Sequence, residues 1–402
     1  KKNRFEIDMC NGSIMDKLIS FSLPLMVSGI LQLAFNAVDI IVVGRFSGSQ
    51  ALAAVGSTTA LINVFTNLFI GISLGANVLA ARFYAAGKDR EMSETVHTSI
   101  TLALISGIMM AVIGVLLAKW ALEIMGTPDD VIGQSALYMR IYFMGMPFFM
   151  LYNYGAAILR AIGDTKRPLI FLIISGIANA ALNMTLVILF HMGVAGVAIG
   201  TIISQLISCV LVLTCLYRSE GSYQLRFSKL KINGAYMEQI FQVGVPAGIQ
   251  STVINFSNAL LQSSVNSFGS TAMAGYTAAN NILGFLYASV NAVTQACMSF
   301  TSQNFGVGKY KRVDLVLRDC MILTVGVSLV LGGGAYLFGN EVLRIYTNDS
   351  EVVRCGVEIL SITTVPYFLC GIMDLFPGSL RGMGYSTVPM ILSVVGTVGM
   401  RI

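Results

Sequence analysis

The chain of 402 residues is 55% hydrophobic and only 11% charged, and its mean hydropathy is +0.76. Soluble domains carry about 25% charged residues, so this composition cannot cover the surface of a soluble protein. A soluble enzyme, a disordered chain and a nucleic-acid-binding protein are therefore excluded, which leaves a polytopic membrane protein. The net charge of +5 is informative only through its distribution along the chain.

Long apolar segments, separated by polar or Gly/Pro-containing turns, follow one another along the chain. A membrane-spanning helix needs about 20 mostly apolar residues. Eleven segments are candidates: 18–43, 51–81, 96–119, 132–159, 168–190, 194–217, 238–265, 272–302, 315–338, 355–380 and 387–402. We therefore expect an all-α membrane protein.

Basic residues concentrate in every second loop. Of the 25 lysines and arginines, 19 lie before the first candidate segment or after an even-numbered one. Loops rich in Lys and Arg stay on the cytoplasmic side of the membrane. This pattern predicts a multi-pass protein of the plasma membrane whose N-terminus is cytoplasmic.

An internal repeat relates the two halves of the chain. Residues 160–168 match residues 381–389 at an offset of 221, and the same offset pairs Gly87-Lys88 with Gly308-Lys309. Two copies of a six-helix unit would have the same orientation and would be related by a pseudo-two-fold axis along the membrane normal. We expect an N-lobe at 1–217, a cytoplasmic linker at 218–235 and a C-lobe at 236–402. The last segment is too short to span the membrane, so the second bundle is expected to stop within helix 11.

Two carboxylic acids lie within predicted spans: Asp39 in the first and Asp374 in the tenth. An ionisable group inside the bilayer is costly and is by default a functional candidate. Asp374 is the repeat equivalent of Asn153 in the fourth segment. Both acids are therefore candidates for binding a proton or a cation.

Polar uncharged residues accompany these acids at helical spacing, which places several of them on shared helix faces. They are Gln32, Asn36, Asn63, Asn67, Asn153, Asn179, Asn183, Thr201 and Gln205 in the first half, and Asn255, Asn258, Gln262, Asn291 and Gln295 in the second. For any single Asn, a hydrogen bond between helices is an equally good explanation. Together they predict polar cavities in both halves.

Gly71-Ile-Ser-Leu-Gly75 matches the G-x-S-x-G pattern of hydrolases. That pattern needs a strand–turn–helix elbow, whereas this segment lies in an apolar helix. Glycines four residues apart, here and at 196/200 and 244/248, favour close helix packing. No Walker motif is present in the sequence, so an ATP-driven pump is not expected.

Four segments resemble one family of transporters: Val38–Gly44, Arg160–Pro168, Gly193–Thr201 and Ser302–Lys309. The chain resembles the MATE (multidrug and toxic compound extrusion) transporters of the MOP superfamily, with mixed DinF-like and NorM-like features. The resemblance implies a twelve-helix, two-lobe fold.

In that family the helix 1 acid responds to cations, and Asp39 matches it. Asn153, Asn179, Asn183 and Thr201 fall on the positions of the family's N-lobe network. Asp374 matches the helix 10 acid of the NorM-like branch, but the glutamate which that branch carries in helix 7 is missing from residues 239–265.

The expected function is a secondary antiporter that exports organic cations in exchange for H⁺ or Na⁺ by alternating access, with a slight preference for H⁺ because one carboxylate is available in the N-lobe. Tyr152, Phe256 and Met298 are expected to contact the substrate. We expect a monomer in the lipid bilayer that is not an enzyme, with no cofactor, no nucleic-acid partner and no metal other than Na⁺ at Asp39.

Two alternatives are open. A flippase for lipid-linked saccharides, from the same superfamily, would need a more basic cavity. An intramembrane enzyme would need a catalytic set, whereas His97 and His191 lie far apart in the sequence.

Overall fold

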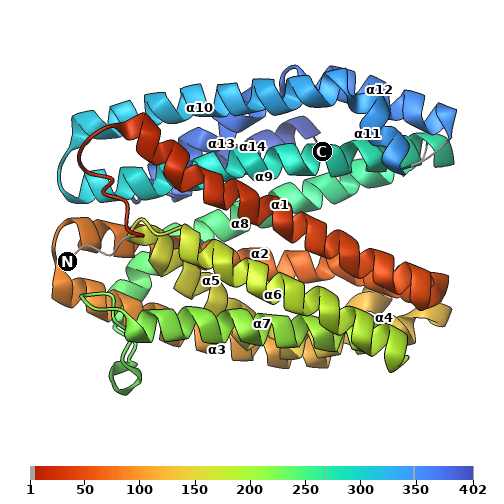
Figure 1. Cartoon of the computed structure of the whole chain (residues 1–402), viewed down its shortest axis with the longest axis horizontal. Coiled ribbons are helices and arrows are strands. Elements are labelled where there is room, and N and C mark those ends of the chain that lie inside the picture. The colour runs from red at the N-terminus through yellow and green to blue at the C-terminus, as the bar shows by residue number, and fades with distance from the viewer. Residues whose placement is uncertain (1–4, 267, 347–348, 402) are drawn as a thin grey trace. The chain divides into compact units, whose positions relative to one another are not determined.

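The computed structural model describes residues 5–266, 268–346 and 349–401, and every regular element in these ranges is a helix (Figure 1). The α-helices are α1 (Ile14–Phe46), α2 (Gly48–Ala85), α3 (Asp89–Ile124), α4 (Asp129–Met144), α5 (Met146–Ala161), α6 (Lys166–Met184), α7 (Gly193–Arg218), α8 (Gly234–Asn266), α9 (Ser270–Gly306), α10 (Tyr310–Leu337), α11 (Gly339–Tyr346), α12 (Ser350–Thr364), α13 (Tyr367–Gly382) and α14 (Thr387–Arg401). A π-helical turn, η1 (Thr185–Leu189), extends α6, and a 3₁₀ turn, η2 (Phe227–Lys229), lies between α7 and α8.

All eleven predicted spans coincide with helices, but two of them are broken. The fourth span is divided at Gly145 into α4 and α5, and the tenth is divided into α12 and α13, which are bent by 51°. A proline lies just after the first break, at Pro147, and within the second, at Pro366, where its missing N–H interrupts the helical hydrogen bonds. By length and composition, seven of the described helices can cross a membrane, or eight with the bent pair.

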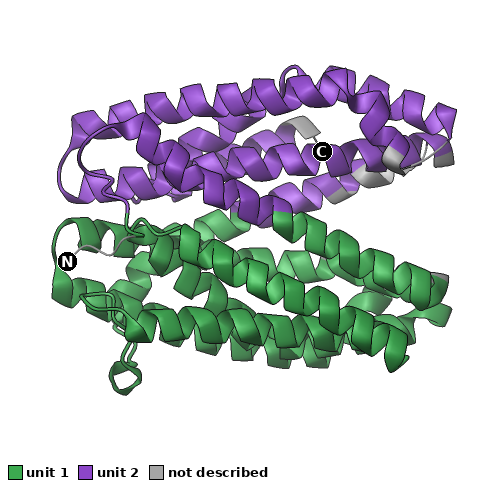
Figure 2. Cartoon of the chain, viewed as in Figure 1, with its two compact units in different colours: residues 1–6, 31–249 green, residues 7–30, 250–402 purple. Residues whose placement is uncertain are grey.

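The chain divides into two compact units (Figure 2). The boundaries fall inside two helices: Leu31–Ile249 belongs to unit 1, whereas Ile7–Ile30 and the residues from Gln250 onward belong to unit 2. The first part of α1 is therefore counted with unit 2, and the first part of α8 with unit 1. The lobes expected at 1–217 and 236–402 were defined by repeats along the chain, and they stay a prediction.

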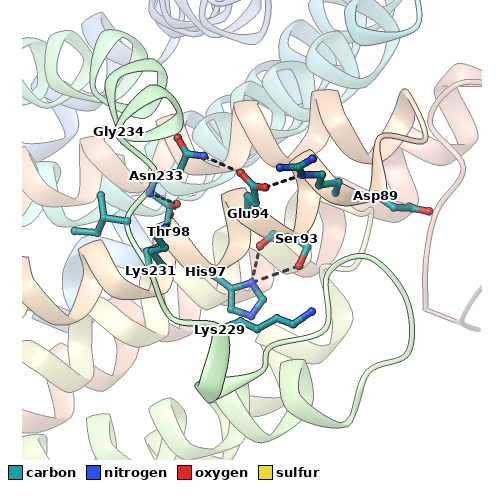
Figure 3. Close-up of a pocket in the computed structure, with 11 residues that line it drawn as sticks. Asp89, Ser93, Glu94, His97, Thr98, Lys229, Lys231, Asn233 and Gly234 are labelled. Carbon is teal, nitrogen blue, oxygen red and sulfur yellow. Dashed lines mark hydrogen bonds and ion pairs between the residues drawn. The ribbon is translucent and has the colours of Figure 1, made fainter.

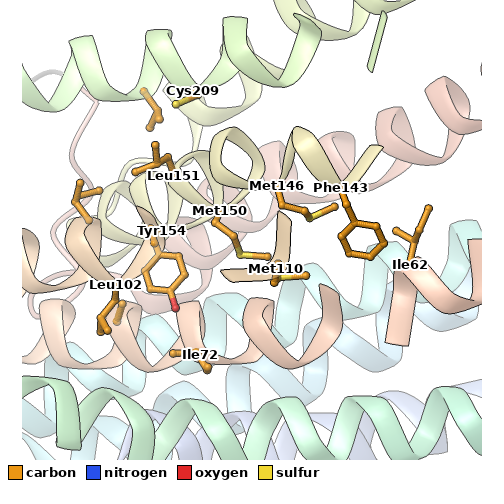
Figure 4. Close-up of a cluster of buried hydrophobic side chains, with 14 of the residues drawn as sticks. Ile62, Ile72, Leu102, Met110, Phe143, Met146, Met150, Leu151, Tyr154 and Cys209 are labelled. Carbon is orange, nitrogen blue, oxygen red and sulfur yellow. The ribbon is translucent and has the colours of Figure 1, made fainter. Parts of the chain in front are cut away.

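Unit 1 has a core of large side chains supplied by α2, α3, α4, α5 and α7 (Figure 4). Phe143, Met146, Met150 and Tyr154 are almost completely buried. The Phe143 ring occupies the place of a missing side chain, because a Cβ added at Gly114 would lie 2.1 Å from it. The core thus shows the close packing typical of protein interiors.

A glycine seam joins α2 to the first part of α8 within unit 1. It consists of Gly71 and Gly75 on α2 and Gly244 and Gly248 on α8. A Cβ added at Gly71 would lie 2.4 Å from the Gly248 backbone, and one added at Gly75 would lie 2.1 Å from the carbonyl oxygen of Ile240. The prediction that these glycines serve close helix packing is confirmed.

Unit 2 holds the N-terminal loop against the turn between α9 and α10. The Lys309 ammonium donates to the carbonyl oxygen of Cys10 (2.8 Å), and the Arg312 guanidinium donates to that of Gly12 (3.0 Å). The amide of Asn304 donates to the carbonyl oxygen of Met9 (3.1 Å). Two of the basic residues from which the membrane orientation was predicted, Lys309 and Arg312, therefore also bind the backbone of the N-terminal loop.

Candidate functional site

The first candidate site lies where α1 meets α6 in unit 1. Phe35 packs on Gly176, where an added Cβ would lie 1.9 Å from the ring, so the two helices approach closely. Asp39 lies one turn after Phe35 on α1, and Asn183 lies two turns after Gly176 on α6. This contact places the acid opposite the asparagine.

The Asn183 amide connects the two parts of this site. Its Nδ2 group donates to Asp39 Oδ1 (2.5 Å) and to Asn179 Oδ1 (2.7 Å). Asn179 Nδ2 donates in turn to Ser204 Oγ (3.3 Å), and Ser204 donates to the carbonyl oxygen of Thr201 (2.8 Å). The structure therefore brings Asp39, Asn179 and Asn183 together.

Thr201 joins this network through its backbone alone. Its hydroxyl donates to the carbonyl oxygen of Val197 (2.9 Å), within the same helix. Ser204, which the sequence did not single out, makes the side-chain contact instead. A serine three residues after Thr201 was the available signal, but serine is common in packed membrane helices.

The carbonyl oxygen of the Asn183 side chain has no hydrogen-bond donor among the described residues, although Asn183 is completely buried. It lies next to Gly200, where an added Cβ would be 2.1 Å away. Buried acceptors are almost always satisfied in folded proteins. The side-chain oxygen of Asn183, on the amide that bonds to Asp39, is therefore an unsatisfied acceptor within the described residues.

Two tyrosines of α4 also lie near the acid. Tyr138 and Tyr142 interact electrostatically with Asp39, and their rings are stacked with centroids 6.0 Å apart. Tyr138 is only 7% exposed. Their i, i+4 spacing on one helix face was visible in the sequence, but nothing there indicated which helix they would face.

The other polar candidates of the first half do not join Asp39 through any hydrogen bond observed within the described residues. The Asn153 amide donates to the carbonyl oxygen of Phe149 in its own helix (2.8 Å), and the Tyr152 hydroxyl donates to that of Pro168 (3.2 Å). Gln205 is half-buried beside Gly145. The remaining four lie on α1 and α2, where Gln32, Asn36 and Asn63 are exposed and Asn67 is half-buried.

The second acid lies in unit 2 and has a basic neighbour. Asp374 and Arg381 are seven residues apart on α13, on one face of the helix, and they interact electrostatically. The Arg381 guanidinium donates to Gln250 Oε1 on α8, and Gln250 Nε2 donates to Ser393 Oγ on α14 (2.7 Å). The sequence assigned Arg381 to a loop, but its side chain turns into the helices.

The other candidates of the second half are spread over α8 and α9. Asn255, Phe256 and Asn258 are exposed, Asn291 and Gln295 are half-buried, and Met298 is 4% exposed. The side chain of Gln262 lies outside the described residues. Phe256 presents 57% of its surface, and Met298 is packed inside unit 2. The two are therefore in different environments.

Long apolar helices with acids and amides buried between them are the arrangement of a polytopic membrane transporter. The family model MatE matches residues 24–185 and 246–402. The chain belongs to the MatE family, and the resemblance inferred from the sequence is confirmed.

Similar proteins carry names that describe drug resistance. The chain is 29% identical to the probable multidrug resistance protein YoeA of Bacillus subtilis, over 97% of this chain and 86% of that protein. It is 23% identical to the multidrug export protein MepA of Staphylococcus aureus, over 95% of this chain and 84% of that protein.

A solved structure has the same fold. It is described as the outward-facing conformation of a multidrug resistance MATE family transporter of the MOP superfamily, and it superposes with a TM-score of 0.93 at 19% identity. The superposition covers 100% of this chain and 89% of that one. At this identity the likeness establishes the all-helical fold of the family alone.

Proposed function

We propose that this chain is a multidrug efflux antiporter of the plasma membrane, with a cytoplasmic N-terminus, which exports organic cations in exchange for H⁺ or Na⁺. The names of its relatives support drug export. The observation that carries the exchange is the hydrogen bond from the buried Asn183 amide to the Asp39 carboxylate, on an amide whose own oxygen has no donor among the described residues. The Asp39 carboxylate attracts a cation, and because its neighbours Asn179 and Asn183 are neutral amides, the cation is held by one negative charge only and can dissociate again.

Exchange follows from competition for one negative charge. A proton or Na⁺ on Asp39 neutralises the carboxylate and weakens its attraction for a cationic substrate. Departure of that ion restores the charge and the site for the next substrate. A proton would bind Asp39 alone, whereas Na⁺ would also need oxygens such as those of Asn179 and Asn183. Because the site has one carboxylate, H⁺ is the favoured ion. Alternating access would expose the site to each side of the membrane in turn.

The two alternatives receive less support. A saccharide-lipid flippase needs basic groups free to hold a pyrophosphate, but Arg381 donates to Gln250 and lies on the same helix face as Asp374. An intramembrane enzyme needs a reactive base. His97 instead donates from Nδ1 to the carbonyl oxygen of Ser93 (2.6 Å) and accepts the Arg226 N–H at Nε2 (3.1 Å), so both nitrogens are used structurally.

The test is uptake of a fluorescent organic cation into proteoliposomes under an imposed pH gradient or, separately, an imposed Na⁺ gradient. We expect the pH gradient to drive uptake in the wild type and to fail in Asp39→Asn. Asp314→Asn removes an exposed acid at the start of α10 and serves as the matched control. Equal gradient-driven uptake in Asp39→Asn and the control would overturn the proposal.

A further inference from the structure

The connection between α7 and α8 folds back on the end of α7. The Leu225 N–H donates to the carbonyl oxygen of Leu216 (3.1 Å), and Tyr223 and Leu225 are buried by this turn. The next four residues, 226–229, are all exposed. We call residues 226–229 the tip; in Figure 1 the connection that carries it projects from one end of unit 1 beyond α3 and α7.

The tip is fastened to α3 on both sides, and Figure 3 shows the bonds on the side of Asn233. At the first residue of the tip, the Arg226 N–H donates to His97 Nε2 (3.1 Å). After it returns, the Asn233 N–H donates to Thr98 Oγ1 (3.1 Å), and the Asn233 amide donates to Glu94 Oε2 (2.7 Å). These bonds fix both ends of the segment 226–233 to α3, so the tip is held in its exposed position within unit 1.

An aromatic pair marks the tip. The Phe227 ring stacks on Tyr217 in the last turn of α7, with centroids 5.8 Å apart and an interplanar angle of 27°. The two side chains are nevertheless 54% and 53% exposed. Exposed aromatic rings at the end of an apolar helix are typical of the level of the lipid headgroups.

Positive charge surrounds this pair. The connection and the end of α7 carry Arg218, Arg226, Lys229 and Lys231 against Glu220. Lys229 and Lys231 line a cavity of about 870 Å³ between the connection and α3, together with Asp89 and Glu94. Glu94 is already engaged by Arg90 (3.0 Å) and Asn233, so cations remain in excess. Juxtamembrane clusters of this kind attract anionic lipids.

We propose that the tip and Lys231 form a binding site for the headgroups of anionic phospholipids, with Phe227 inserted at the level of the headgroups. This proposal is independent of the transported substrate and of the coupling ion. Lipid phosphates would meet Arg226, Lys229 and Lys231, while the ring of Phe227 would leave water. A neutral phospholipid would gain only the contact with the ring.

The experiment uses the purified full chain in detergent and native mass spectrometry, with added phosphatidylglycerol or phosphatidylcholine. The wild type is expected to retain phosphatidylglycerol preferentially. Each cation near an anionic surface contributes about fivefold, so the Arg226→Gln/Lys229→Gln/Lys231→Gln variant should bind phosphatidylglycerol about 100-fold more weakly. Lys119→Gln/Arg344→Gln/Arg354→Gln, which removes three exposed cations elsewhere, should match the wild type.

A second variant, Phe227→Ser, should weaken the retention of both lipids and leave the preference for phosphatidylglycerol unchanged. The single variant Lys229→Gln, expected to weaken phosphatidylglycerol binding about fivefold, tests the site if the triple variant does not fold. Undiminished phosphatidylglycerol binding in the folded triple variant, or in Lys229→Gln, would overturn the proposal. An equal loss in the control with three cations removed elsewhere would overturn it as well.

Discussion

Asp39 and Asp374, the two half-buried acids within predicted spans, are surrounded differently. Asp39, in unit 1, is bonded to the neutral amide of Asn183, which continues to Asn179 and Ser204. Asp374, in unit 2, has the guanidinium of Arg381 on the same face of its helix. Amide dipoles stabilise a negative charge without neutralising it, whereas an arginine supplies a permanent counter-charge.

This difference separates the two acids by role. An acid whose neighbours are neutral responds strongly to a proton or cation that arrives, because that ion is its counter-charge. An acid that already has an arginine gains less from the same ion. The repeat sharpens the contrast, since Asn153 takes the place of Asp374 in the first half. We infer that ion exchange belongs mainly to the half that contains Asp39.

The largest expected effect separates the acids directly. Asp39→Asn should reduce gradient-driven uptake by about 5- to 150-fold, the range of a typical coupling free energy between two sites. Asp374→Asn should cause a clearly smaller loss, because Arg381 on the same helix face already stabilises the charge of Asp374. Uptake in proteoliposomes under a fixed gradient measures both, and equal losses would remove the distinction between the halves.

Arg381→Gln should remove a positive charge that stabilises the Asp374 carboxylate and should disconnect α13 from Gln250. We expect the free energy of unfolding to fall by about 1 kcal/mol, because Arg381 is half-buried and makes no ion pair with Asp374 among the described residues. Adding Asp374→Asn should recover part of this loss, since the unpaired charge is then gone. Thermal or denaturant unfolding in detergent gives the values, and strict additivity would argue against any interaction of the two residues.

Asn183→Ala should alter the first site without removing its acid. The Asn183 amide donates a hydrogen bond that stabilises the Asp39 carboxylate, so its loss favours the protonated acid and is expected to lower the half-saturating concentration of H⁺ about tenfold. Titration of uptake with the ion measures this change. Asn153→Ala is the matched control, because its amide bonds to its own helix; a similar shift in that variant would contradict a specific role for Asn183.

Gly200→Ala should have the smallest effect of the series. The new Cβ would press on the side-chain oxygen of Asn183 and move its amide relative to Asp39, and overpacking of this kind costs about 1 kcal/mol. Because the carboxylate is then less well stabilised, we expect the half-saturating concentration of H⁺ to fall severalfold. Gly326→Ala, on α10, where nothing lies within 4 Å of the added Cβ, should leave the response unchanged.

Much of this fold could be predicted from the sequence, because a bilayer demands long apolar helices and each one leaves a signal in the hydropathy. The breaks at Gly145 and before Pro366 were missed, since a hydropathy average over many residues does not register a local loss of helical hydrogen bonds. Arg381 was misplaced for a related reason: a long side chain at a helix end can turn inward or outward with the same sequence.

The candidate site was predictable as a set of residues but not as a set of contacts. Asp39 stands out because charge is rare in an apolar helix, and helical spacing groups Asn179 with Asn183. Which side chains come into contact depends on how closely two helices approach each other. Here the close approach of α1 and α6 is set by Phe35, which packs on Gly176. Nothing in the sequence indicates that these two residues are in contact.

The glycine seam between α2 and α8 has a consequence for how this chain can vary. Where two backbones touch, a larger residue on one helix cannot be accommodated by a smaller side chain on the other, because the opposite position is already glycine. A larger residue at Gly71 or Gly248 therefore has no compensating substitution on the opposite helix. We therefore expect the four seam positions on α2 and α8 to tolerate only glycine, although they lie far apart in the sequence. Residues away from the seam can be replaced more freely.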